Sequence, residues 1–237
     1  MNSMLHVDGL HAGYGKALVL NGVDIEVEEG AIVCLIGPNG AGKSTVFRCI
    51  YNLLSPSRGS ITFKGEEITG LSQRELLDRG LGYMLQRDAV FPEMTVRENL
   101  ELGGYTAPDG VDTDDRLAEV YDLFPKLSTR ESQQAGTLSG GERQMVEFAR
   151  GLMQDPDMLL LDEPSAGLSP KNIDTVFEKV LEINELGVTI LMIEQNVNTA
   201  LDYADRGYVL ENGQTRFDGP AETLLDQPEI RDAYLGG

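Results

Sequence analysis

The sequence predicts an α/β fold in which a parallel sheet is joined by a small antiparallel β subdomain and a helical subdomain. Three observations support this prediction. Residues 4–36 alternate apolar and polar positions, which indicates antiparallel strands with one buried face. Residues 158–161 and 188–193 are almost continuously apolar, as is typical of parallel strands covered by helices on both faces. Residues 87–155 have a mainly helical pattern, interrupted by a polar loop at 107–115.

The predicted elements follow one another with no low-complexity linker and no internal repeat. Asn21-Gly22 and Glu29-Gly30 are turn signals in the N-terminal sheet, which leads into a strand at 31–36. A helix at 172–185 joins the two apolar strands, as in a parallel crossover. We therefore expect a single domain, with a core formed by 1–86 and 156–237 and a helical insertion at 87–155.

Charge is the unusual feature of the composition. The chain has 237 residues, 41% of them hydrophobic, which is enough for a sizeable core. Its 39 acidic and 19 basic residues give a formal net charge of −20. Such a surface repels nucleic-acid phosphates and anionic lipids, so we expect no nucleic-acid partner. This acidic balance, with 6 lysines against 13 arginines, is similar to that of cytoplasmic proteins from organisms that keep molar salt inside, and predicts a halophilic source.

Cys34 and Cys49 are the only cysteines, and both lie in apolar segments. Buried, reduced thiols are therefore expected instead of a disulfide, which indicates a reducing cytoplasm. The sequence has no run of about 18 apolar residues, and its N-terminus lacks the basic-then-apolar layout of a signal peptide. If the protein works at a membrane, we expect other chains to hold it there.

The acidic segment DGVDTDD, at 109–115, invites comparison with a calcium-binding EF-hand loop. Counted from Asp112, the sixth position is Leu117 and the twelfth is Leu123, where an EF-hand has glycine and glutamate. The spacing excludes this motif. The segment is expected to be a solvated acidic loop.

The segment GPNGAGKS, at 37–44, matches the pattern G-x-x-x-x-G-K-[ST] between a predicted strand and a predicted helix. Its glycines let backbone N–H groups approach phosphate oxygens, and the helix N-terminus adds its dipole. Lys43 is placed to neutralise the β- and γ-phosphates, and Ser44 to bind Mg²⁺. A chance glycine-rich turn would not need the flanking strand and helix, so we predict a P-loop NTPase (RecA-like) core.

Two adjacent carboxylates follow the apolar run in LLLDEP, at 159–164. Asp162, at the end of a strand beside the phosphate loop, suits a metal-binding role, directly or through water. Because side chains alternate along a strand, Glu163 is expected to have a different role, orienting or deprotonating an attacking water. The alternative is an acidic strand end that faces solvent.

The segment LSGGERQ, at 138–144, contains the pattern of a capping box. Ser139 can cap a helix, and Glu142 can reach back to the N–H group of the cap residue. A cap does not require Gly140 and Gly141, because glycine in a first helical turn costs backbone entropy and adds no packing. These glycines predict that something outside the helix approaches its backbone.

Together the three motifs resemble the ATP-binding cassette (ABC) family, whose signature motif is LSGGE, and the resemblance covers essentially the whole chain. It implies that the protein binds ATP and Mg²⁺ and forms a head-to-tail dimer. In that dimer, the signature helix of one subunit faces the γ-phosphate held by the other. Ser139, Gly140 and Gly141 would then act in trans, and the glycines would admit the phosphate.

The resemblance also implies further site residues. Tyr14 would stack on adenine, although an aromatic residue in a small sheet is more often a packing residue. Gln86 would sense Mg²⁺ and the γ-phosphate. The segment 89–100 would touch membrane subunits, or else form local core. The nucleotide-binding residues implied are Tyr14, Gly37, Pro38, Asn39, Gly40, Ala41, Gly42, Lys43, Ser44, Thr45, Gln86, Ser139, Gly140, Gly141 and Glu142, and the metal-binding residues are Ser44, Gln86 and Asp162.

Two positions depart from the family pattern. Gln195 stands where the family usually has a histidine that contacts the γ-phosphate, and Ser169 stands where many members have aspartate. Glutamine forms hydrogen bonds but cannot carry a proton near neutral pH. The catalytic residues implied are thus Lys43, Glu163 and Gln195, and hydrolysis is expected to be slow or to depend on a partner.

The segments 193–201, 204–213 and 230–237 look like those of the second ATPase subunit of branched-chain amino-acid importers, which pairs with a sibling ATPase bearing the histidine. Within them, Asn212-Gly213 has a structural explanation as a tight turn. The resemblance implies a peripheral ATPase on the cytoplasmic face of the membrane. It would dimerise with itself or a sibling, drive permease subunits, and serve an extracytoplasmic binding protein indirectly.

Three alternatives remain open. A soluble cassette ATPase of DNA repair or translation would be expected to show a long coiled-coil insertion, paired cassettes or a basic surface, and the sequence has none of these. An assembly module that binds ATP and hardly hydrolyses it is suggested by Gln195, but Glu163 argues against it. Among transporters, the ATPase of a lipopolysaccharide or other exporter is the nearest competitor.

Overall fold

The computed structural model describes residues 3–84, 90–105, 107 and 112–230. The chain divides into two compact units, one consisting of Met1–Gln73 and Thr189–Gly237, the other of Arg74–Val188. The second unit extends beyond the predicted helical insertion at 87–155 because it also includes a pair of parallel strands.

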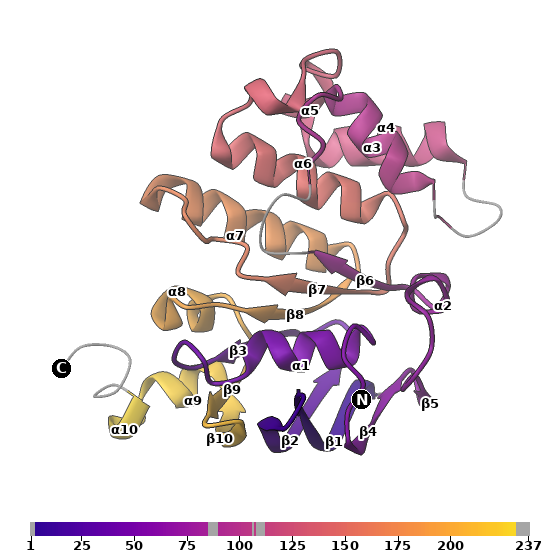
Figure 1. Ribbon diagram of the computed structural model, residues 1–237. Coiled ribbons are helices and arrows are strands. Elements are labelled where there is room, and N and C mark those ends of the chain that lie inside the picture. Colours follow the sequence, from indigo (N-terminus) through magenta and orange to yellow (C-terminus); the bar gives the residue numbers. More distant parts are fainter. Residues whose placement is uncertain (1–2, 85–89, 106, 108–111, 231–237) are drawn as a thin grey trace. The chain divides into compact units, whose positions relative to one another are not determined.

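The first unit contains an antiparallel sheet with the strand order β2-β1-β4-β5 (Figure 1). Its strands are β1 (Ser3–Tyr14), β2 (Ala17–Glu28), β4 (Arg58–Phe63) and β5 (Glu66–Glu67). Buried and exposed residues alternate along much of β1 and β2, as the sequence pattern predicted. One face of this sheet is therefore part of the core.

The predicted turn at Asn21-Gly22 is wrong, because β2 runs through these residues. Leu10 pairs with Val23 and His11 pairs with Asn21, so Gly22 is an extra residue opposite a continuous β1. Gly22 has φ 84°, which fits a β-bulge in which glycine occupies the left-handed region. The Asn-Gly pair therefore correctly indicated a residue with positive φ, but this residue lies in a β-bulge and not in a turn.

The other strands of the first unit form a mainly parallel arrangement. β3 (Ile32–Ile36) pairs in parallel with β8 (Thr189–Ile193) and with β9 (Arg206–Glu211), and β10 (Gln214–Pro220) pairs with β9 in the antiparallel sense. All residues of β3 and β8 are buried. For β8 this confirms the prediction from the nearly unbroken apolar run at 188–193. The helices of this unit are α1 (Lys43–Ile50), α8 (Val197–Asp202), α9 (Ala221–Leu225) and α10 (Pro228–Ile230).

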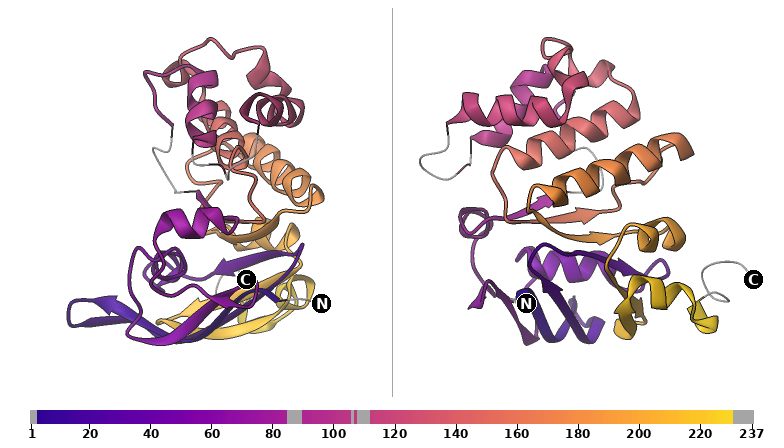
Figure 2. Two further views of the ribbon diagram at one scale, coloured as in Figure 1. Left: turned by 90° about the vertical axis from the view of Figure 1, so that its right-hand side faces the viewer. Right: turned by 180° about the vertical axis from the view of Figure 1, so that it is seen from behind.

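The second unit combines two parallel strands, β6 (Leu81–Met84) and β7 (Met158–Asp162), with helices that pack mainly around one central helix. Figure 2 shows this helical group from two further sides. The central helix is α6 (Gly140–Leu152), and α3, α4, α5 and α7 all contact it. The remaining elements are α2 (Gln73–Asp78), α3 (Val96–Gly104), α4 (Thr113–Leu123), α5 (Pro125–Ser128), η1 (Ala135–Thr137) and α7 (Pro170–Glu185).

Two predicted segments in this unit differ slightly from the observed ones. The helix predicted at 172–185 begins at Pro170, because proline with its fixed φ is suited to the first helical position. In the acidic segment, α4 already begins at Thr113. The Asp112 carboxylate accepts hydrogen bonds from the N–H groups of Asp114 and Asp115. Asp112 is therefore a helix N-cap, which explains one acidic residue of that segment in structural terms.

Cys34 and Cys49 are buried and free, as predicted. Burial raises the pKa of the Cys34 thiol well above its usual range and that of the Cys49 thiol to about 12, so both remain protonated. Within the described residues, no helix is long and apolar enough to cross a lipid bilayer.

Candidate active site

The loop at 37–42 connects the end of β3 to the start of α1 and requires glycine at several positions. Gly37, Gly40 and Gly42 have φ of 147°, 82° and 109°, all in the region that favours glycine. A Cβ atom at Gly37 would lie 2.1 Å from the backbone oxygen of Leu210 in β9. The neighbouring strand therefore excludes any side chain at the first glycine. Pro38, Asn39 and Gly40, the next three residues of the loop, are exposed.

Lys43 is the first residue of α1 and is only 5% exposed. Its Nζ donates hydrogen bonds to the carbonyl oxygens of Gly37 at 2.7 Å and Pro38 at 3.3 Å, so its ammonium group lies inside the loop. The first turn of α1 has no acidic residue, and Gly42 at the N-cap offers no side-chain cap. A buried cation at an uncapped helix N-terminus attracts an anion, and phosphate is the group that this geometry fits.

Ser44 and Thr45, which follow Lys43 in α1, differ in their exposure to solvent. Ser44 is exposed, so its hydroxyl is accessible to a metal ion that accompanies a nucleotide. Thr45 is buried at 7% exposure. Exposure alone therefore favours Ser44 as the metal ligand of this pair.

The tight turn at Asn212-Gly213 supports the loop in a way that sequence reasoning did not predict. Asn212 and Gly213 have φ of 49° and 75°, which confirms the predicted turn between β9 and β10. The Gly213 N–H group donates to the Ala41 carbonyl in the loop at 3.0 Å, and the Gly213 carbonyl accepts from the Asn21 N–H group at 2.7 Å. The turn thereby connects the phosphate loop to strand β2.

Tyr14 and Gln195 lie in the same unit as the loop, and both are exposed. Tyr14 ends β1 with 46% of its surface accessible, and its hydroxyl accepts a hydrogen bond from Arg48 Nη1 at 3.4 Å. Gln195 lies between β8 and α8, and the following Asn196 caps α8 by accepting from the Thr199 N–H group. The side chain of Tyr14 is thus accessible to a ligand, and Gln195 lies at the surface.

Sequence reasoning missed Glu194, a carboxylate that is only 2% exposed and follows β8 directly. Its charge helps to raise the pKa of the Cys34 thiol, after burial itself, whereas the charge of Lys43 acts in the opposite direction. Glu194 and Lys43 therefore both lie near the buried Cys34 in β3. An acidic residue immediately after an apolar strand was the signal that could have identified it.

In the second unit, Asp162 is the last residue of β7 and Glu163 lies beyond the strand. Asp162 accepts a hydrogen bond from the Tyr83 hydroxyl at 3.1 Å, a partner that sequence reasoning did not identify. Glu163 has φ 53°, in the left-handed region that glutamate rarely adopts. Because β7 ends at Asp162, the alternation of side chains along a strand does not extend to Glu163. The left-handed backbone at Glu163, and not this alternation, sets the direction of its side chain relative to that of Asp162.

The signature segment has the capping box that the sequence predicted. The Ser139 Oγ accepts from the Glu142 N–H group at 3.4 Å, and Glu142 Oε2 accepts from the Ser139 N–H group at 2.9 Å. A Cβ atom at Gly140 would meet only the Leu168 side chain, at an ordinary contact distance of 3.7 Å. Packing among the residues that the structure describes therefore does not require glycine at Gly140. Gln86, the remaining predicted site residue, lies outside the described residues.

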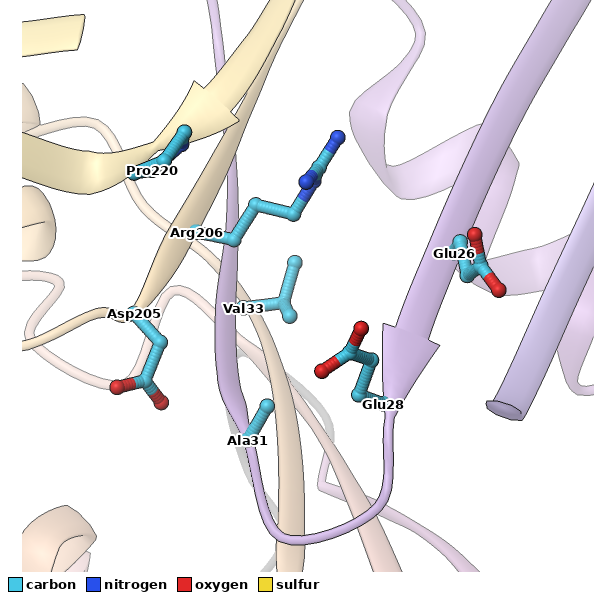
Figure 3. A pocket seen from close by; sticks show the side chains of 7 residues that line it. All are labelled: Glu26, Glu28, Ala31, Val33, Asp205, Arg206 and Pro220. Atoms are coloured by element: carbon cyan, nitrogen blue, oxygen red, sulfur yellow. The ribbon is translucent and has the colours of Figure 1, made fainter. Parts of the chain in front are cut away.

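A cavity of about 190 Å³ lies near the start of β3, at the end of the strand that is opposite the phosphate loop (Figure 3). Arg206 in this cavity pairs with Asp218, and the Asp205 carboxylate accepts from the Ile32 N–H group at 2.8 Å. Carboxylates outnumber cations among its lining residues, so it would repel a polyphosphate. The lining residues are Glu26, Glu28, Ala31, Val33, Asp205, Arg206 and Pro220.

The loop at 37–42, the buried Lys43 and the uncapped start of α1 define a P-loop protein that binds a nucleoside triphosphate. Comparison with known proteins is consistent with this class. The family model described as ABC transporter matches residues 20–166. The structure is similar to a crystal structure of the ADP conformation of an ATP-binding cassette of an ABC transporter, with a TM-score of 0.91, 31% identity and complete coverage of both chains.

Two relatives are similar over nearly their whole length. The high-affinity branched-chain amino acid transport ATP-binding protein BraG of Pseudomonas aeruginosa is 44% identical over 99% of this chain and 100% of its own. The lipopolysaccharide export system ATP-binding protein LptB of Acidithiobacillus ferridurans is 33% identical over 100% of this chain and 98% of its own. The chain therefore belongs to the ABC transporter family, and it is an ATPase cassette of that family.

Proposed function

We propose that this chain is the ATP-hydrolysing subunit of a membrane importer for branched-chain or related amino acids, bound peripherally to permease subunits on the cytoplasmic face. Two observations support the proposed cargo. The segments at 193–201 and 204–213 resemble those of the second ATPase subunit of such importers. The relative named for branched-chain amino acid transport is 44% identical, whereas the relative named for lipopolysaccharide export is 33% identical.

The open backbone at Gly140 is the observation that carries the proposed dimer. Ser139 and Gly140, at the N-terminus of α6, are exposed, and among the described residues a Cβ atom at Gly140 would meet only the Leu168 side chain, at 3.7 Å. A helix N-terminus attracts negative charge. In a head-to-tail dimer, Ser139, Gly140 and Gly141 would bind the γ-phosphate held by the phosphate loop of the partner subunit, so ATP would favour the closed dimer by contacting both subunits.

Catalysis would depend on positioning and charge neutralisation, as is general for phosphoryl transfer. Lys43 would neutralise the β- and γ-phosphates, and the exposed ring of Tyr14 would stack on adenine. Glu163 would orient or deprotonate the attacking water. Gln195 would hold the γ-phosphate by hydrogen bonds, since its amide cannot transfer a proton near neutral pH.

The oxygen donors of the chain fit Mg²⁺, which enters such sites together with the nucleotide. The exposed Ser44 hydroxyl and the Asp162 carboxylate would bind it, with Gln86 as a third group named from the family resemblance. When bound, Mg²⁺ neutralises part of the phosphate charge. Tyr83 would orient Asp162 for this role through its hydroxyl hydrogen bond.

The first test is the steady-state Mg-ATPase activity of the purified chain in high KCl, measured as the protein concentration rises. Activity that grows with the square of concentration would support a homodimer in which Gln195 suffices. No activity, with ATP still bound, would point to a required sibling subunit that carries the histidine. A chain that binds no ATP would refute the proposed function.

The cargo requires a separate test in cells that depend on this subunit. Glu163→Gln in the resident protein should abolish uptake of radiolabelled leucine and leave uptake of an unrelated solute unchanged. Unchanged leucine uptake would contradict the assignment to branched-chain amino acids and would favour another ABC system.

A further inference from the structure

Glu142 creates an electrostatic conflict at the helix end that is proposed to receive a phosphate. It is the third residue of α6, and its carboxylate folds back onto Ser139, the cap of that helix. Ser139 donates to Glu142 Oε2 both from its N–H group at 2.9 Å and from its hydroxyl at 2.7 Å. The cap is therefore held by a negative charge at the place where the γ-phosphate is expected, and like charges repel.

Arg130 engages the other oxygen of the same carboxylate. Its Nη1 lies 2.9 Å from Glu142 Oε1, and the two side chains are 41% and 26% exposed. The hydrogen bonds from Ser139 are the main cause of the lowered pKa of Glu142, and the charges of Arg130 and Lys126 lower it further. Both oxygens of Glu142 thus have defined partners.

The backbone around Arg130 is fixed by local hydrogen bonds. The Arg130 N–H group donates to the Leu127 carbonyl at 3.0 Å, and the Arg130 carbonyl accepts from the Gln133 N–H group at 2.8 Å. Leu127 on α5 is only 1% exposed, so this segment is anchored in the core of its unit. Arg143 adds a second cation near the cap, since its Nη1 donates to the Leu138 carbonyl at 2.8 Å.

We infer that Arg130 is a positioning residue for the signature helix. It holds Glu142 on the Ser139 cap and cancels its charge, so that the N-terminus of α6 attracts the γ-phosphate of ATP bound to the partner subunit. The inference rests on the proposed function, because it assumes that the signature acts on a nucleotide across a dimer. It assigns to Arg130 no contact with the nucleotide itself.

The test measures ATP-driven dimerisation in a Glu163→Gln background, where hydrolysis is blocked and the dimer accumulates. Arg130→Gln should raise the ATP concentration for half-maximal dimerisation by about two- to fivefold, the effect expected of a partly exposed ion pair. Adding Glu142→Gln to Arg130→Gln should restore most of the loss, because the uncompensated charge is then gone. Arg130→Lys should retain more function than Arg130→Gln.

The matched control is Arg74→Gln, which removes an equal charge from an exposed pair with Asp78 elsewhere in the same unit. If Arg130→Gln dimerises like this control, or if Glu142→Gln fails to restore it, the inference is overturned. Binding of a fluorescent ATP analogue to the monomer should be equal in all these variants. Loss of that binding in the parent chain would instead refute the proposed nucleotide site, so the two failures are distinguishable.

Discussion

Replacing Gly213 with alanine should disturb the phosphate loop from a residue that lies outside it. A Cβ atom at Gly213 would lie 1.9 Å from the Val19 carbonyl oxygen, so the turn must move. That movement disrupts the hydrogen bonds of Gly213 with Ala41 and Asn21. We expect Gly213→Ala to lower the melting temperature and to weaken ATP binding, because Ala41 belongs to the loop.

The magnitude follows from a matched variant at Gly65, which lies in the turn between β4 and β5. Gly65 has φ 78°, close to the 75° of Gly213, but a Cβ atom there would meet none of the described residues within 4 Å. Both alanine variants carry the penalty of a left-handed residue, about 1–2 kcal/mol. Gly213→Ala should lose a further 1–3 kcal/mol or so, because about 0.5–1.5 kcal/mol is typical for each of two backbone hydrogen bonds.

Thermal melts and equilibrium binding of ATP on both variants provide the assay. For a chain of this size, 1 kcal/mol corresponds to roughly 2–4 °C in melting temperature. Gly65→Ala should bind ATP like the parent chain, whereas Gly213→Ala should not. Equal melting temperatures for the two variants would refute the reasoning from the close approach to Val19.

Four further predictions concern single groups. Lys43→Ala should lose most ATP binding because it removes the buried ammonium, and unchanged affinity in a binding titration would refute the phosphate site. Glu163→Gln should retain ATP and accumulate as a dimer in size-exclusion chromatography, so normal turnover would exclude Glu163 as the base. Ser139→Ala should destabilise the chain by about 1 kcal/mol through loss of the helix cap, and an unchanged melting curve would contradict this. Because the pKa of Cys49 is raised to about 12 and that of Cys34 is also raised, neither thiol should react with iodoacetamide at pH 8 before the protein unfolds; labelling of the folded chain would show otherwise.

Local patterns in the sequence correctly predicted two buried strands and the geometry of one motif. The unbroken apolar runs indicated β7 and β8, and both strands are fully buried. The spacing of Ser139 and Glu142 predicted the capping box that the structure contains. These predictions succeeded because each depends on residues within a few positions of one another.

Contacts between distant segments could not be predicted in this way. The Gly37 backbone lies against Leu210, and Arg130 pairs with Glu142 from another segment. The turn expected at Asn21-Gly22 is a bulge because β1 continues to pair on both sides of it. The sequence alone indicates that the backbone at such a glycine has positive φ. The pairing of the neighbouring strand determines whether that residue lies in a turn or in a bulge.

The left-handed conformation of Glu163 implies a trade-off between stability and activity. A left-handed glutamate strains the backbone by about 1–2 kcal/mol, whereas asparagine tolerates the same conformation more readily. Selection for thermostability alone would therefore favour Glu163→Asn, at the expense of the carboxylate proposed as the base. We expect that variant to melt at or above the temperature of the parent chain while turnover is lost. The most stable version of this cassette and the one that hydrolyses ATP would then be different sequences.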